Sequence, residues 1–160
     1  MIRPATPDDA AAIAAIYNHY ILHTTVTFET EPVSETEMRR RMEEIAASYP
    51  YLVEETDGCL TGYCYAHRWK EKEAYRPTAE TTIYVRPDCH RQGCGRRLLA
   101  ALLEACRKQG LHSLVACITV PNEASVCLHR AFGFRQVSRF AEVGRKFGQW
   151  LDIYDFECIL

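Results

Sequence analysis

A chain of 160 residues with a formal net charge of −2 is long enough to bury one hydrophobic core without a disulfide or a metal to hold it together. Hydrophobic residues make up 48% of it and charged residues 25%, which is typical of a globular domain and excludes a disordered or membrane-embedded chain. The slightly acidic balance argues against general nucleic-acid binding, because that partner requires a basic face that displaces counterions from phosphates.

The N-terminal segment and the cysteines bear on where the chain works. The first residues lead directly into a polar helix signal, with neither a secretory leader nor a run that could span a bilayer. The eight cysteines form no C-x-x-C pair, and most lie in apolar periodic segments such as 114–118, where a thiol packs as a small hydrophobe. Reduced packing residues are therefore favoured over disulfides or a zinc site. We expect one domain over residues 1–160, in the cytoplasm, with no metal and no membrane or nucleic-acid partner.

Two helices are predicted in the first third of the chain, after a short strand at Ile2. Residues 6–9 read as an N-cap, a proline and an acidic first turn, and an apolar stripe at helical spacing follows. Residues 24–32 break that period and predict an irregular connection. A capping box at residues 34–37 opens the second helix, whose arginines 39–41 are interpreted as a solvated face because acidic residues surround them.

The middle of the chain is predicted to form strands. Residues 51–55 and 60–67 are separated by an Asp-Gly turn that favours a hairpin. A third strand over 80–85 is stopped by Pro87, which lacks a ladder donor. The polar loop 69–77 lies between the second and third strands and carries several cations.

The last third alternates helices and strands. Residues 95–109 have an apolar helical face and a stop at Gly110. A buried strand is predicted over 113–120 and a short helix from an Asn122 cap through residue 131. Closing strands are expected over 134–143 and 150–159, which gives a mixed α/β layered domain.

The segment 85–99 places a strand, a glycine-bearing loop and a helix start in succession. Gly93 and Gly95 let the backbone approach a phosphate, toward which the first helical N–H groups point. A dinucleotide fingerprint would require a third glycine where Leu98 stands, and a P-loop would require Gly-Lys-Ser/Thr. A helix that merely begins with glycines remains open on these residues alone.

The same loop resembles the signature of the GNAT superfamily of N-acetyltransferases, Gln/Arg-x-x-Gly-x-Gly/Ala. Gly93 and Gly95 match it, whereas His90 stands where the family usually has Gln or Arg. Further segments are similar to the phosphinothricin acetyltransferase branch, which acetylates the amine of phosphinothricin, methionine sulfoximine or sulfone, and arsinothricin; they are residues 16–19, 69–70, 74–75, 78–80, 125–129 and 146–152. The resemblance implies an α/β (α+β) GNAT fold with a mixed, mostly antiparallel sheet of about seven strands, about four helices and splayed central strands.

The resemblance also implies acetyl-CoA as co-substrate. The Val85 main chain would bond the pantetheine arm, the residues after Gln92 would surround the pyrophosphate, and the start of the next helix would touch the arm or the thiol. The cofactor-binding residues implied are Val85, Arg86, Pro87, Gly93, Cys94, Gly95, Arg96, Arg97, Leu98, Asn122 and Ser125.

Acetyl transfer to an amine requires an uncharged nitrogen, a polarised carbonyl and a proton for the departing thiolate. The family resemblance implies that Glu80 is the base and acts through water, with an ion pair to a loop lysine as the structural alternative. His129 stands where many GNAT enzymes have a tyrosine acid, and acid, base, substrate-contact and purely structural roles stay open for it. Cys94 lies near a helix N-terminus, so a reactive thiolate is a further alternative.

The acceptor is predicted to be a small anionic amino acid. Lys70, Lys72 and Arg76, with Tyr75 among them, could hold an anionic tail by charge-assisted hydrogen bonds, although exposed lysines also serve simply as solubilising groups. By resemblance, Phe28 and Tyr84 wall the pocket and the enzyme is a homodimer. The alternatives are acetylation of a protein N-terminus, a lysine or a polyamine, and a non-catalytic acyl-CoA-binding module.

Overall fold

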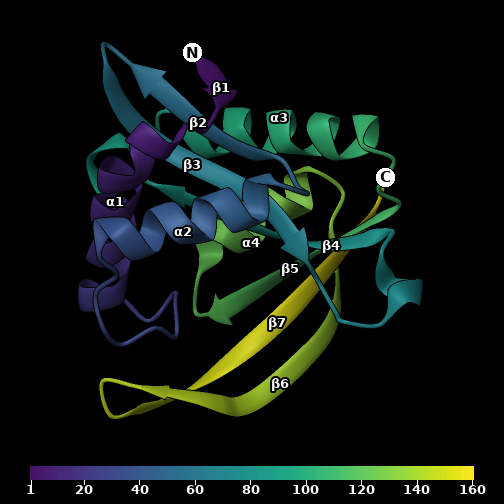
Figure 1. Cartoon of the computed structure of the whole chain (residues 1–160). Helices are drawn as coiled ribbons and strands as arrows, with labels where there is room; N and C mark the ends of the chain where they lie inside the picture. Colours follow the sequence, from purple (N-terminus) through teal and green to yellow (C-terminus); the bar gives the residue numbers. More distant parts are fainter.

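A computed structural model describes all 160 residues. Its strands are β1 (Ile2–Pro4), β2 (Tyr51–Thr56), β3 (Cys59–Arg68), β4 (Thr78–Val85), β5 (Ser113–Val120), β6 (Arg135–Lys146) and β7 (Gln149–Ile159). Its α-helices are α1 (Ala10–His23), α2 (Glu35–Ala46), α3 (Cys94–Lys108) and α4 (Glu123–Ala131). The predicted fold class is confirmed, since the strands form one mixed seven-stranded sheet with these helices packed around it (Figure 1).

The strands follow the order β1-β2-β3-β4-β5-β7-β6. Neighbours are antiparallel except β4 and β5, which run parallel because α3 carries the chain back across the sheet between them. Register pairs join β4 and β5 only over Thr78–Glu80 and Ser113–Val115. Beyond this segment the two strands separate, and Thr81 Oγ1 donates to the Val115 carbonyl at 3.3 Å where they part. We call this place the β4–β5 fork; it confirms the expected splay of the central strands.

Helices cover both faces of the sheet and divide the core in two. On one face, α1 and α2 pack on β2 and β3 in a cluster of 11 buried residues that includes Ile13, Met42 and Tyr63. On the other, α3 and α4 pack on the central strands in a cluster of 16 buried residues that includes Leu99 and Phe156. Figure 1 shows α1 and α2 in front of the sheet and α3 behind it. The β4–β5 fork therefore lies between the helices that cover the two faces of the sheet.

Most helices and strands begin and end near the predicted residues, and one predicted helix cap differs in the structure. Asn122 caps α4 by accepting from the Ser125 N–H at 3.2 Å, as predicted. The first helical segment begins as a 3₁₀ turn at Pro7–Asp9 before α1. Ser34 caps α2 at 3.2 Å, but the capping box predicted at residues 34–37 is half formed, because the Glu37 carboxylate binds arginines instead.

The hairpin of β6 and β7 projects beyond the helical layers (Figure 1). Both strands are longer than the sequence pattern indicates: β6 continues to Lys146, and a tight turn at Phe147 and Gly148, both with positive φ, leads into β7. Large apolar side chains on this hairpin are exposed, namely Val137, Phe140, Val143, Phe147 and Trp150. No helix has both the length and the apolar character needed to cross a membrane.

Candidate active site

The β4–β5 fork opens into a cavity of about 890 Å³, which is in the range of small-molecule and cofactor sites. Its walls come from the C-terminal halves of β4 and β5, the end of α1 with residues 24–28, the loop before α3, and the start of α4. Segments far apart in the sequence thus meet where the sheet divides. The cavity is the candidate active site.

The loop before α3 forms one end of this cavity. Gly93, the N-cap of α3, has a φ of 79°, a left-handed conformation that favours glycine. A Cβ at Gly95 would lie 3.4 Å from Leu128 of α4 and 3.7 Å from Val85 of β4, which are ordinary contact distances, so the space at this position would admit a methyl group. Gly93, Cys94 and Gly95 line the cavity, and the unpaired N–H groups of a first helical turn suit a diphosphate.

The predicted cofactor residues fall into two groups. Lining the cavity are Val85, Gly93, Cys94, Gly95, Asn122 and Ser125. The others do not line it; they are Arg86, Pro87, Arg96, Arg97 and Leu98. Leu98 is fully buried in the core, and the guanidinium of Arg86 lies 2.6 Å from Asp88. Arg97 bonds the buried Glu54 carboxylate at 2.5 Å and the Gln92 carbonyl at 2.9 Å.

Tyr20 contacts the loop before α3, and the sequence gives no sign of this contact. Its hydroxyl donates to the Val85 carbonyl at 2.5 Å and lies 2.8 Å from His90 Nε2. Because the single phenolic proton goes to Val85, the phenolic oxygen accepts at the second contact, and the N–H of His90 Nε2 is the donor. His90, the mismatch in the glycine motif, thus ties this loop to α1. Tyr20 could not be singled out, since in the sequence it reads as part of the apolar stripe.

Glu80 lies at the last position of β4 that pairs with β5, and it lines the cavity. Burial raises the pKa of its carboxyl, His67 opposes that rise and Asp155 adds to it. The Glu80 carboxylate lies 3.9 Å from His67 Nε2, and it forms no ion pair with the loop lysine considered as a structural alternative. Glu80 is a half-buried carboxylate of increased basicity inside the cavity.

His129 lies on α4 and is 2% exposed. Its Nδ1 is 2.8 Å from the Ser125 carbonyl, which can only accept, so Nδ1 carries the proton and Nε2 holds a lone pair. Nε2 is buried without a partner in a cavity-lining side chain, and burial lowers the pKa of the imidazole. The ring is therefore a neutral acceptor, which favours a base or contact role over that of a preformed acid.

The predicted acceptor residues are also divided. Phe28 and Tyr84 line the cavity with Glu80 and His129, whereas Lys70, Lys72, Tyr75 and Arg76 do not. Lys70 Nζ lies 4.1 Å above the Trp69 ring. Arg76 pairs with Glu73 at 2.7 Å.

The cysteines show no sign of a reactive thiolate in the glycine loop. The Cys94 side chain is buried, its sulfur lies 3.6 Å from the Thr61 hydroxyl, and burial raises the pKa of the thiol to about 12. The nucleophile interpretation of Cys94 therefore finds no support. Cys117 and Thr119 of β5 also line the cavity; the sequence places them only in a buried strand.

Comparisons with known proteins agree with this geometry. Residues 2–154 match the model of the acetyltransferase (GNAT) domain family. A phosphinothricin N-acetyltransferase of Streptomyces viridochromogenes is 42% identical over 95% of this chain and 83% of its own length. An L-methionine sulfoximine/L-methionine sulfone acetyltransferase of Salmonella typhimurium is 40% identical over 95% and 90%. A solved GNAT phosphinothricin acetyltransferase of Sinorhizobium meliloti, in complex with AcCoA, superposes with a TM-score of 0.97 at 34% identity, covering 100% of this chain and 88% of its own.

Proposed function

The chain belongs to the GNAT acetyltransferase family, and on this premise we propose that it transfers the acetyl group of acetyl-CoA to the α-amine of a small glutamate-like amino acid. The observation that carries the proposal is the cavity at the β4–β5 fork, where the glycine loop, Glu80 and His129 line one continuous space. Relatives named for the acetylation of phosphinothricin and methionine sulfoximine support this choice of acceptor.

The residues present fit acetyl-CoA. The amides that follow Gly93 would hold the pyrophosphate, while Val85, Asn122 and Ser125 would line the path of the pantetheine arm. When bound there, acetyl-CoA supplies an activated thioester. The N–H groups on the free edge of β4 are the candidate donors to its carbonyl oxygen.

The catalytic roles are assigned to Glu80 and His129, which both line the cavity. An amino acid arrives as an ammonium ion and must lose a proton before its nitrogen can attack. Glu80, whose pKa is raised by burial, accepts that proton through water. His129 offers the lone pair of Nε2 to the amine or its water, and a proton taken up there can be returned to the departing thiolate.

The cationic loop and the subunit arrangement belong to the same proposal. Lys70, Lys72 and Arg76 precede β4, and we assign them to attraction of the acceptor's anionic tail toward the cavity mouth. The exposed apolar side chains of the β6–β7 hairpin support a homodimer. The eight free cysteines suit a reducing cytoplasm.

The test is acetyl-CoA turnover with a panel of acceptors. We expect CoA release with phosphinothricin, methionine sulfoximine or arsinothricin, and much less with a peptide N-terminus, a lysine side chain or a polyamine. Glu80→Gln should lower kcat by about 10²-fold or more while leaving the dissociation constant of acetyl-CoA unchanged. Turnover of peptides alone would contradict the amino-acid assignment. Full activity of Glu80→Gln would contradict the mechanism, and binding of acetyl-CoA without any turnover would favour a non-catalytic module.

A further inference from the structure

Residues 24–34 connect α1 to α2 and contain no helix or strand. Thr24, Val26, Thr27 and Phe28 of this segment nevertheless line the cavity that holds Glu80 and His129. A loop that forms part of a binding wall must be held by other elements to keep its shape. This one is held from three sides.

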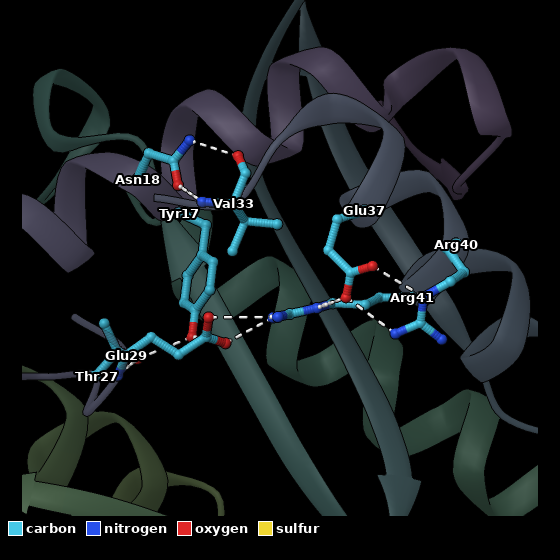
Figure 2. A network of polar contacts seen from close by, with 8 residues as sticks. All are labelled: Tyr17, Asn18, Thr27, Glu29, Val33, Glu37, Arg40 and Arg41. Carbon is cyan, nitrogen blue, oxygen red and sulfur yellow. Dashed lines mark hydrogen bonds and ion pairs between the residues drawn. The ribbon is translucent and has the colours of Figure 1, made fainter. Parts of the chain in front are cut away.

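The first attachment comes from α1, as Figure 2 shows. Tyr17 donates its phenolic proton to Glu29 Oε1 at 3.0 Å, so at 2.8 Å the Thr27 hydroxyl is the donor to Tyr17. The Asn18 amide bonds both backbone groups of Val33, donating to its carbonyl at 2.9 Å and accepting from its N–H at 2.8 Å. Both ends of the stretch from Thr27 to Val33 are thereby fixed to one helix.

The second attachment comes from α2 and also converges on Glu29. Arg41 Nη1 donates to Glu29 Oε1 at 2.6 Å, while Arg41 Nε donates to Glu37 at 2.8 Å (Figure 2). Arg40 holds the same Glu37 carboxylate. Charge-assisted bonds of this kind are the stronger ones, and here they orient the arginine that holds the loop.

The third attachment comes from β6 and concerns consecutive loop residues. Lys146, which is 3% exposed, donates from Nζ to the Thr27 carbonyl at 2.8 Å. The ring of the next residue, Phe28, lies directly on Gly144: a Cβ built at Gly144 would be 2.3 Å from Phe28 Cε2. No side chain fits between them. Gly144 does not have a positive φ, so a left-handed backbone does not explain the glycine, whereas the space taken by the Phe28 ring does.

We propose that Gly144 is a specificity-determining position for the acceptor: lacking a side chain, it seats the Phe28 ring in the cavity wall. The Tyr17, Arg41 and Lys146 contacts prevent the loop backbone from withdrawing, so an added methyl group must displace the ring itself. This inference rests on the proposed function for the identity of the acceptor. It adds a residue of β6, outside the cavity lining, that acts through Phe28 as a positioning residue.

The experiment is a double-mutant cycle with Gly144→Ala, Phe28→Ala and the double variant. Gly144→Ala should change kcat/KM for the amino-acid acceptor by about tenfold or more, since small misplacements in a reacting complex are costly, and leave KM for acetyl-CoA within about twofold. In the Phe28→Ala background the same substitution should have no further effect. Calorimetric titration of acceptor into the CoA-bound enzyme gives a readout independent of turnover.

The matched control is Gly148→Ala in the turn of the same hairpin. Its Cβ would meet nothing within 4 Å, but φ is 76°, so this variant strains the hairpin without touching Phe28. It should lower Tm and leave acceptor selectivity unchanged. If Gly144→Ala alone does not fold, the double variant should fold, because removing the ring makes room for the methyl group.

Three outcomes would overturn the inference. The first is a Gly144→Ala variant whose kcat/KM for the acceptor is unchanged, and the second is an equal effect of this substitution in the Phe28→Ala background. The third applies if Gly144→Ala does not fold, and it is a double variant that does not fold either. Failure of the proposed function is distinguishable, because it appears in the wild-type enzyme as an absence of amino-acid turnover. The coupling between Phe28 and Gly144 is then measured with the acceptor that wild type does use, and from the Tm values of the four proteins.

Discussion

At the scale of single residues, burial shifts the pKa values of Glu80 and His129 in opposite directions. The pKa of Glu80 is raised by burial and that of His129 is lowered by burial, so each environment favours the neutral form. For Glu80 this increases the basicity of the carboxylate. For His129 it preserves the lone pair of Nε2 near neutral pH. Glu80 is therefore a stronger base than an ordinary glutamate, whereas His129 is a neutral hydrogen-bond acceptor of lowered proton affinity.

The lowered pKa of His129 predicts a pH-dependent stability. In the unfolded chain the imidazole has an ordinary pKa of about 6.5, above its folded value, so its contribution to the free energy of unfolding is present above about pH 6.5 and is lost as the pH falls toward the folded pKa. Urea melts between about pH 8 and pH 5 should show wild type losing more stability than His129→Gln. Subtracting the free energies of unfolding of the two proteins cancels the contribution of the other titrating groups. Equal losses would contradict a buried neutral imidazole.

At the scale of elements, Glu54 of β2 and Arg97 of α3 fix the glycine loop. Burial alone would raise the pKa of the Glu54 carboxyl, but the bonds from Arg97, Cys94 and Thr61 leave it below its usual value. Arg97 also holds the Gln92 carbonyl, two residues before the start of α3. A side chain that reads in the sequence as a phosphate ligand is thus occupied in positioning the loop.

This arrangement predicts that removing the carboxylate weakens acetyl-CoA binding. If Arg97 bound the pyrophosphate directly, Glu54→Gln would free the guanidinium and preserve or strengthen binding. If Arg97 acts by holding Gln92, Glu54→Gln and Arg97→Gln should both raise the dissociation constant of acetyl-CoA, by about fivefold or more, which corresponds to ~1 kcal/mol. Calorimetry on the two variants and their double separates these cases, because a shared role makes the double variant no worse than either single one.

The sequence predicted the elements better than it predicted their assembly. Helix α3 was expected over 95–109 and is Cys94–Lys108, because its apolar face and Gly110 are local signals. The parallel pairing of β4 with β5 depends on contacts across more than thirty residues and has no local signature. The splay, and with it the cavity, came from family resemblance alone.

For the site, the same limit applies. Glu80 and His129 were assigned by matching positions, and the structure places both in one cavity. The contacts made by Tyr20, Arg97 and Gly144 depend on which side chain of a distant element lies opposite. Residue type carries no such information: a tyrosine in an apolar stripe reads as core, and an arginine after a glycine loop reads as a phosphate ligand.

At the scale of the whole molecule, the β6–β7 hairpin exposes an apolar surface. Phe140, Val143, Phe147 and Trp150 are 48%, 51%, 58% and 60% exposed, and such a concentration on one projecting element marks an interaction surface. The proposed homodimer would use this surface. Phe140 and Val143 belong to β6, the same strand that holds the cavity loop through Gly144 and Lys146.

The dimer is tested by making this surface polar. Phe140→Ser combined with Trp150→Ser should convert a dimer into a monomer in sedimentation experiments, with little change in the far-UV circular dichroism, because both side chains are largely solvent-exposed in the single chain. Leu22→Ser on α1, at 48% exposure, is the control for loss of an exposed apolar residue elsewhere and should remain a dimer. An unchanged sedimentation coefficient in the double variant would place the interface on another surface.

The β4–β5 fork has a thermodynamic consequence for the sheet. Two strands that part after a short paired segment leave hydrogen-bonding groups inside the sheet without the partners that a continuous ladder would supply. Any extended molecule that bonds both edges replaces those partners and binds only the folded chain. The free energy of unfolding then increases with the ligand concentration, by RT ln(1 + [L]/Kd). The cavity that we propose as the active site would then also be where the fold gains stability from its ligand.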